Sequence, residues 1–163
     1  MRLRQLTPDD SITALTALLH AAYASLGAIG LNYTAVDQSD EVTLRRIAGG
    51  ECWLALDGDA LIGTVLFRPP GVSRGTPHFE RPTVASLGQF AVAPSRQREG
   101  VGAILMRHAE IRAREIGAAE LALDTAEGAA HLIAWYGRQG FRFVEYAQWE
   151  GKTYRTLVMS KRI

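Results

Sequence analysis

The stretch that most constrains the fold is residues 87–102, which read LGQFAVAPSRQREGVG. An apolar run with strand character ends at Pro94, and two glycines then lead into a helical pattern of apolar residues. We predict a strand over residues 84–92, a glycine turn, and a helix over about residues 100–116. The chain must therefore place the N-terminus of a helix directly beyond the end of a strand.

Such a turn is suited to binding an anion. The unpaired N–H groups of a first helical turn and the positive end of the helix dipole favour a pyrophosphate, and Arg96 and Arg98 are candidates to add charge. Because proline cannot donate to a sheet ladder, we expect the strand to end or splay at Pro94. An extended ligand with amides of its own could then pair with the freed backbone groups.

Periodicity and turn residues predict the other elements, in the order β-α-α-β-β-β-α-β-α-β-β. This order indicates an α/β fold with one mixed sheet and helices on its faces. The predicted elements are a strand over 2–6, a helix that starts at residues 7–10 and breaks at Gly27, a short helix from Ser39 or Asp40 to Gly49, a hairpin of residues 52–56 and 61–67, a long loop over 69–82, a strand near 121–123, a helix over 129–139, and strands over 141–149 and 154–160.

The apolar spacing also predicts which helix residues face the core. In the second helix these are Val42, Leu44 and Ile47. In the third they are Val101, Ile104, Leu105, Ala109 and Ile111.

Size and charge exclude several classes of function. With 163 residues and 47% hydrophobic content, the chain suffices for one core, so we expect a single domain over residues 1–163. The 18 basic and 17 acidic residues nearly cancel without a basic run, which argues against nucleic-acid and anionic-membrane partners. No membrane span or signal-like start is evident, so we expect a cytoplasmic protein. The four histidines and Cys52 lack metal-ligand spacing.

Two motifs resemble those of a known family. Gln97-x-x-Gly100-x-Gly102 after an apolar strand resembles the acetyl-CoA signature of the GCN5-related N-acetyltransferase (GNAT) family, and the run from Trp135 through Tyr136 to Gly140-Phe141 resembles that family's late helix-to-strand element. The resemblance spans nearly the full chain. It implies the GNAT fold and an N-acetyltransferase that uses acetyl-CoA as cosubstrate.

The resemblance also implies roles for individual residues. The backbone of Phe90, Ala91 and Val92 would bind the pantetheine arm, and Tyr136 would protonate the leaving CoA thiolate. One departure is Ala129, where many members have a cofactor-binding asparagine, and Thr125 is a candidate substitute. The pyrophosphate would lie on the turn made by Gln97, Arg98, Glu99, Gly100, Val101 and Gly102.

The group that accepts the amine's proton stays open. Family members often place a carboxylate on the strand that precedes the motif, but here that strand carries Gln89, which cannot act as a base. The alternatives are a chain of water molecules or one of four side chains: His78, Glu80, Asp124 and Glu127.

The acceptor also stays open. The family's fold implies an acceptor site built from the first two helices and the loops opposite the cofactor, and our candidates there are Tyr23, Tyr33, Glu80 and Gln89. We expect a primary amine of a small molecule or an amino acid, because no dense acidic patch suits a polycation. The alternatives are a protein N-terminus or lysine, a catalytically silent acyl-CoA-binding module, and a nucleotide-binding α/β protein, although the turn lacks the ending of a P-loop. Acyl length is open, and a homodimer is common in the family.

Overall fold

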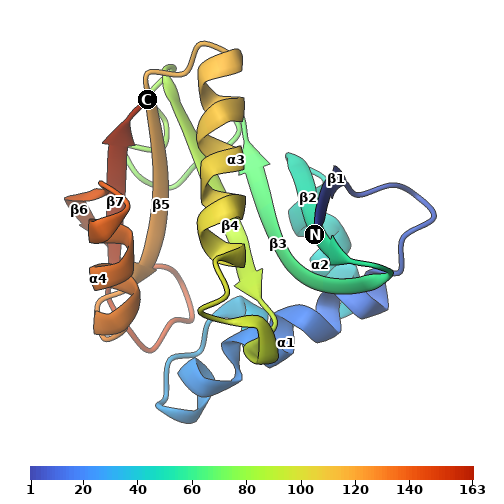
Figure 1. Cartoon of the computed structure of the whole chain (residues 1–163). Helices are drawn as coiled ribbons and strands as arrows, with labels where there is room; N and C mark the ends of the chain where they lie inside the picture. Colours follow the sequence, from blue (N-terminus) through green and yellow to red (C-terminus); the bar gives the residue numbers. More distant parts are fainter.

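A seven-stranded mixed sheet runs through the computed structural model, which describes residues 1–163, in the order β1-β2-β3-β4-β5-β7-β6 (Figure 1). All neighbouring strands are antiparallel except β4 and β5, which are parallel. The strands are β1 (Arg2–Gln5), β2 (Glu51–Asp57), β3 (Ala60–Arg68), β4 (Val84–Val92), β5 (Glu120–Ala126), β6 (Arg142–Ala147) and β7 (Thr156–Arg162).

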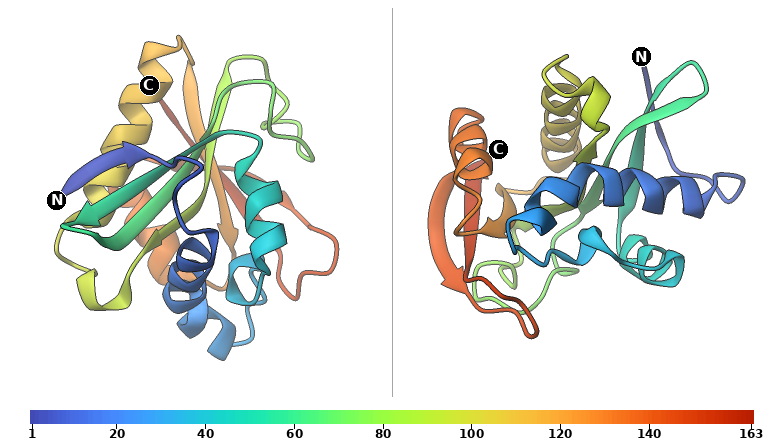
Figure 2. Two further views of the ribbon diagram at one scale, coloured as in Figure 1. Left: turned by 90° about the vertical axis from the view of Figure 1, so that its right-hand side faces the viewer. Right: turned by 90° about the horizontal axis from the view of Figure 1, so that it is seen from below.

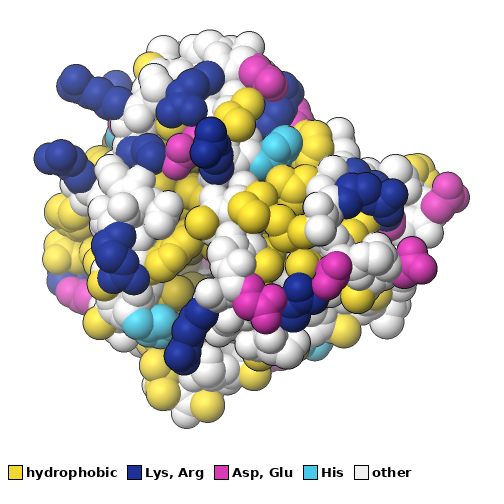
Figure 3. Space-filling view, in the orientation of Figure 1, with side chains coloured by type: hydrophobic (Ala, Val, Ile, Leu, Met, Phe, Trp, Pro, Cys, Tyr) yellow, Lys and Arg dark blue, Asp and Glu magenta, His cyan; other side chains and the backbone are white.

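Four α-helices cover the two faces of this sheet. Helices α1 (Ile12–Ala28) and α2 (Asp40–Ile47) lie on one face, and α3 (Val101–Glu115) and α4 (Ala130–Arg138) lie on the other (Figures 1 and 2). The predicted element order and the α/β class are confirmed. No helix combines the length and apolar character that crossing a bilayer requires. On the α3–α4 face, acidic side chains are interspersed among the basic ones (Figure 3).

The start of α1 differs from the prediction. Ser11 caps the helix by accepting a hydrogen bond from the Ala14 N–H at 3.1 Å, so the helix begins four residues later than residues 7–10 suggested. The Thr7 N–H donates instead to Asp10 Oδ2 at 2.8 Å, and Arg4 binds the same carboxylate at 2.6 Å. The Arg4 guanidinium holds the pKa of Asp10 far below its usual range. These residues therefore form a turn that ties the end of β1 to the helix.

The prediction of which residues of α2 and α3 face the core was also partly wrong. Leu44 is 50% exposed, and Ile104 and Ile111 are 42% and 41% exposed. Helix α3 instead buries residues that are four positions apart, together with Met106. Through this buried face the helix packs against β3. Its alanines allow close approach to the sheet. The buried residues of α3 are Val101, Leu105, Met106, Ala109 and Ala113.

The sheet opens between its two central strands. β4 and β5 pair only where Val84–Ser86 lie beside Glu120–Ala122, and beyond this point they diverge (Figure 1). The strands thus separate well before Pro94, whereas β4 itself ends at Val92, close to that proline, as one of our two expectations held. A bulge in the β3–β4 pairing accompanies the opening, and Gln89 there has a φ of 44°, which is rare for a residue with a side chain. Strain of this kind is typical of functional sites.

The N-terminal cap of α2 should contribute to the stability of the fold. Ser39 accepts a hydrogen bond from the Val42 N–H at 3.2 Å, so Ser39→Ala removes the cap of the helix that carries Arg46. We expect a loss of about 1 kcal/mol in the free energy of unfolding, measured by urea denaturation. Ser39→Asp keeps a capping oxygen and should be nearly neutral. Equal losses in both variants would contradict this role.

Candidate active site

The turn before α3 presents a row of free backbone donors. No N–H group of residues 98–103 has an acceptor within the chain, because these residues precede the first helical hydrogen bond, from Ile104 to Gly100 O at 3.1 Å. Arg98 and Gly100 have φ values of 66° and 85°, so the turn curves through left-handed backbone. Successive free N–H groups at a helix N-terminus can bind an anion, and these donors lie where the glycine pattern predicted such a turn; we call them the donor cradle.

A pocket of about 520 Å³ begins at this cradle and follows the opening of the sheet. It is lined on one side by Phe90, Ala91 and Val92 of β4, and on the other by residues of α4 that include Trp135 and Tyr136. Gln97, Arg98, Gly100 and Gly102 also line it, which brings together most of the predicted cofactor residues. We call this the cofactor-side pocket.

The side chains of Arg96, Glu99 and Val101, which belong to the turn that we expected to bind pyrophosphate, do not line this pocket, and neither does Ala129. Arg96 binds Asp57 and Glu99 at 2.8 and 2.7 Å, so its charge and that of Glu99 are largely neutralised. The Val101 side chain is buried in the core, which leaves only its N–H for a ligand. Ala129 is also fully buried, beside Leu26 and Ala126.

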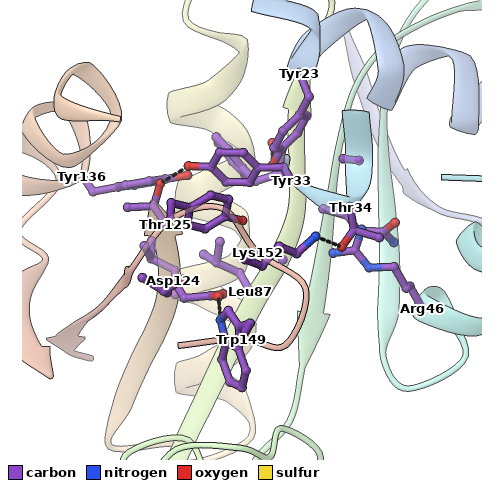
Figure 4. Close-up of a pocket in the computed structure, with 17 residues that line it drawn as sticks. Tyr23, Tyr33, Thr34, Arg46, Leu87, Asp124, Thr125, Tyr136, Trp149 and Lys152 are labelled. Atoms are coloured by element: carbon purple, nitrogen blue, oxygen red, sulfur yellow. Dashed lines mark hydrogen bonds between the residues drawn. The ribbon is translucent and has the colours of Figure 1, made fainter. Parts of the chain in front are cut away.

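A second pocket of about 270 Å³ lies on the other side of the opening (Figure 4). Tyr33 crosses it, and its hydroxyl binds Thr125 Oγ1 at 2.9 Å and accepts from the Ala126 N–H at 2.8 Å. Thr125 therefore lines this pocket and not the cofactor-side pocket, where we had expected it. Tyr23 and Gln89, two other acceptor candidates, also line it. We call it the acceptor pocket.

Tyr136 lies where the two pockets meet. Only Tyr23, Phe90 and Tyr136 line both of them. The Tyr23 hydroxyl donates to Phe90 O at 3.1 Å, whereas the Tyr136 hydroxyl has no hydrogen-bond partner in the chain. Burial raises the pKa of Tyr136 well above its usual value, so the hydroxyl keeps its proton at neutral pH. A free, protonated donor thus sits between the two ligand spaces.

Of the four side chains considered as a base, only Asp124 lies in the acceptor pocket. Its Oδ2 accepts from Trp149 Nε1 at 2.8 Å (Figure 4). The Asp124 side chain is exposed to the pocket, but the protein atoms around it partly desolvate the carboxylate and raise its pKa, against the opposing effects of Trp149, Arg68 and Arg46. A carboxylate with a raised pKa is a better base.

The other three base candidates lie elsewhere. His78 is buried 3.3 Å from Glu120, and Glu127 pairs with Arg155 on the surface at 2.6 Å. Glu80, expected as both acceptor-site residue and base, is exposed in the long loop and accepts from the Gly75 N–H at 3.2 Å. It lines neither pocket, because its loop folds over the far end of the β4–β5 pair. No group of His, Cys, Asp and Glu side chains in the chain is arranged to hold a metal ion.

Two cationic residues of the acceptor pocket were not predicted from the sequence. Arg46 reaches it from α2, and Lys152 reaches it from the β6–β7 loop (Figure 4). Lys152 Nζ donates to Asn32 O at 2.8 Å and to Thr34 Oγ1 at 2.9 Å. For Arg46 the only local signal was a pair of basic residues, Arg45 and Arg46, at the end of a short amphipathic helix, and such residues are usually solvated.

A split sheet with an anion cradle on one side and a small polar pocket on the other defines a protein that brings a phosphate-bearing ligand and a second, small ligand together. Comparison with known proteins agrees. The model of the Acetyltransferase (GNAT) family matches residues 15–141, and the chain therefore belongs to this family.

Individual relatives match a smaller part of the chain than the family model does. The chain is 27% identical over 106 residues to the uncharacterized N-acetyltransferase YvbK of Bacillus subtilis (65% of this chain, 62% of that protein). It is 46% identical over 58 residues to the streptothricin acetyltransferase of Streptomyces lavendulae (36% and 31%). The matches thus span less than two thirds of either relative. A GNAT acetyltransferase from Elizabethkingia anophelis, solved with acetyl-CoA bound, shares the fold with a TM-score of 0.71, 18% identity and 99% and 97% coverage.

Proposed function

We propose that the chain transfers an acetyl group from acetyl-CoA to the primary amine of a small molecule or an amino acid. The observation that carries the proposal is the meeting of the two pockets at Tyr136. The donor cradle of residues 98–103 suits the pyrophosphate of CoA, and the cofactor-side pocket leads from there to Tyr136. The acetyl-CoA bound to the related Elizabethkingia fold supports this choice of cosubstrate.

The proposed reaction is direct attack of the amine on the thioester. The acceptor's ammonium gives a proton to Asp124, and the free amine forms the new N–C bond to the acetyl carbon. The C–S bond breaks, and Tyr136 donates its proton to the leaving thiolate. The amide nitrogen loses its second proton to solvent, Asp124 releases the proton that it accepted to solvent, and solvent reprotonates Tyr136. Both side chains line the acceptor pocket, where the proposed reaction takes place.

The acceptor pocket favours a small acceptor over a protein. At about 270 Å³ it lies below the usual range of drug-sized sites. One side of the pocket, at Thr34 and Lys152, is bounded by a clasp, which we define as the hydrogen bonds between residues 30–34 and residues 151–153. Asn32 Nδ2 donates to Gly151 O at 2.8 Å, and Thr153 Oγ1 donates to Gly30 O at 2.7 Å. An extended peptide would have to cross this clasp.

Calorimetry and a thiol-release assay test the proposal. We expect the purified protein to bind acetyl-CoA and not ATP, and to release CoA thiol when small primary amines are added. Binding of acetyl-CoA without release on any amine would favour a silent acyl-CoA-binding module. Release only with peptide N-termini or peptide lysines would overturn the small acceptor, and failure to bind acetyl-CoA would overturn the proposal itself.

A further inference from the structure

The charges around the acceptor pocket are unbalanced. Arg46 and Lys152 line it together with a single carboxylate, that of Asp124. Asp124 and Trp149 also line an adjoining cavity, whose wall includes Arg68. The two cavities are thus lined by one carboxylate and by four basic residues, which are Arg46, Lys152, Arg68 and Arg74. Burial lowers the pKa of Arg46, Arg68 and Lys152, but the two guanidiniums, with their very high intrinsic pKa, stay charged.

Neither guanidinium has a carboxylate partner. Arg46 donates to the neutral amide oxygen of Gln38 at 2.5 Å, and Arg68 makes no side-chain hydrogen bond in the chain. Arg68 lies against Gly88, where an added Cβ would be 2.6 Å from Nη1. Gly88 itself lines the acceptor pocket, so glycine at this position lets the guanidinium sit directly against the pocket wall. Partly buried cations without counterions are costly unless a ligand supplies the charge.

The buried amide of Gln89, which is linked to Arg46 through Gln38, also has an unpaired donor. Gln38 Nε2 donates to Gln89 Oε1 at 2.9 Å, which orients the Gln89 amide and leaves its Nε2 donor facing away from Gln38. That Nε2 atom is buried without any acceptor, and Gln89 is only 4% exposed in the wall of the acceptor pocket. Buried donors in folded proteins are nearly always satisfied. The hydrogen-bonded series Arg46–Gln38–Gln89 therefore presents donor groups for which the protein itself offers no acceptor.

We infer that the acceptor is an amine that also carries a carboxylate, as an amino acid does, with the carboxylate bound at Arg46 and the ammonium at Asp124. The inference rests on the proposed function and deepens it. A guanidinium fork matches a carboxylate with two parallel hydrogen bonds, and the small pocket keeps the two charged ends of the ligand close together. A polycationic acceptor meets repulsion from Arg46, Arg68 and Lys152 here.

The test compares amino acids with their own carboxamides. Glycine, β-alanine, 4-aminobutyrate and larger L-amino acids are each titrated, beside the matching amide, into protein saturated with CoA. Each pair has the same size and the same amine, and differs in the carboxylate charge. We expect at least one acid to bind about tenfold or more tightly than its amide, since hydrogen bonds to a charged group are worth roughly 1.5–3 kcal/mol. The same acid should be the better acceptor in the thiol-release assay.

Arg46→Met should abolish this preference, and Arg46→Lys should keep part of it. The matched control is Arg45→Met, because Arg45 is the neighbouring, exposed residue of α2 and makes no hydrogen bond. Its preference should equal that of the wild type, and circular dichroism checks that all variants fold. Equal binding of acids and amides, no binding of any acid, or an unchanged preference in Arg46→Met would overturn the inference. Failure of the proposed function is distinct, because it appears as absent acetyl-CoA binding or absent thiol release.

Discussion

Tyr136→Phe is expected to lower kcat for acetyl transfer by roughly 10²- to 10⁴-fold, the usual contribution of a general acid. The substitution removes one oxygen and keeps the ring, which packs against Trp135 and Phe141 at centroid distances of 5.3 and 6.1 Å. The affinity for acetyl-CoA, measured by calorimetry, should therefore change little. A loss in kcat with unchanged binding identifies an interaction made in the transition state.

The matched control is Tyr146→Phe. Tyr146 lies on β6, is 49% exposed, and lines neither pocket, so its hydroxyl should be irrelevant to the rate. A kcat within about twofold of the wild type in Tyr136→Phe would show that another group, or water, protonates the thiolate. A parallel fall in both variants would point to a general effect on the fold.

The parts of the site that lie close together in sequence could be predicted from it. The strand over residues 84–92 has the bounds that we expected, and the helix after it begins within one residue of the expected position. The donor cradle depends on one continuous segment, residues 98–103, whose glycines and helix start can both be recognised in the sequence. Local geometry of this kind is set by backbone conformations that particular residues permit.

The acceptor pocket could not be predicted in the same way. Its charged residues come from α2, β5 and the β6–β7 loop, and only the sheet order places these elements together. The opening between β4 and β5 begins after Ser86, because the pairing with Glu120–Ala122 ends there, and no residue type marks that point. A charged side chain gives the same local signal whether it is solvated or lines a pocket. Thus Arg46 and Lys152 were not distinguishable from surface residues.

Asp124→Asn is expected to lower kcat/KM at neutral pH by roughly 10²- to 10⁴-fold, because asparagine cannot accept the amine's proton. The amide oxygen can still accept from Trp149 Nε1, so the pocket wall should persist. In the wild type, burial raises the pKa of Asp124, and activity should fall as the pH drops through this raised value. The acidic limb of the kcat/KM profile should therefore lie above the usual carboxyl range, and it should vanish in Asp124→Asn.

The substitution Asp124→Asn should not lower the stability of the fold, although it should lower the activity. A raised pKa means that the folded protein binds the proton more tightly than the unfolded chain does, so this group's stabilising contribution is lost as the pH rises through the folded pKa. Because the Asp124 side chain is exposed to the pocket, this contribution is small, and Asp124→Asn should leave Tm nearly unchanged. Glu127→Gln is the control, because Glu127 pairs with Arg155 on the surface and should not affect the rate. Normal turnover in Asp124→Asn would return the proton transfer to water, whereas a loss of activity together with a lower Tm would mark Asp124 as structural.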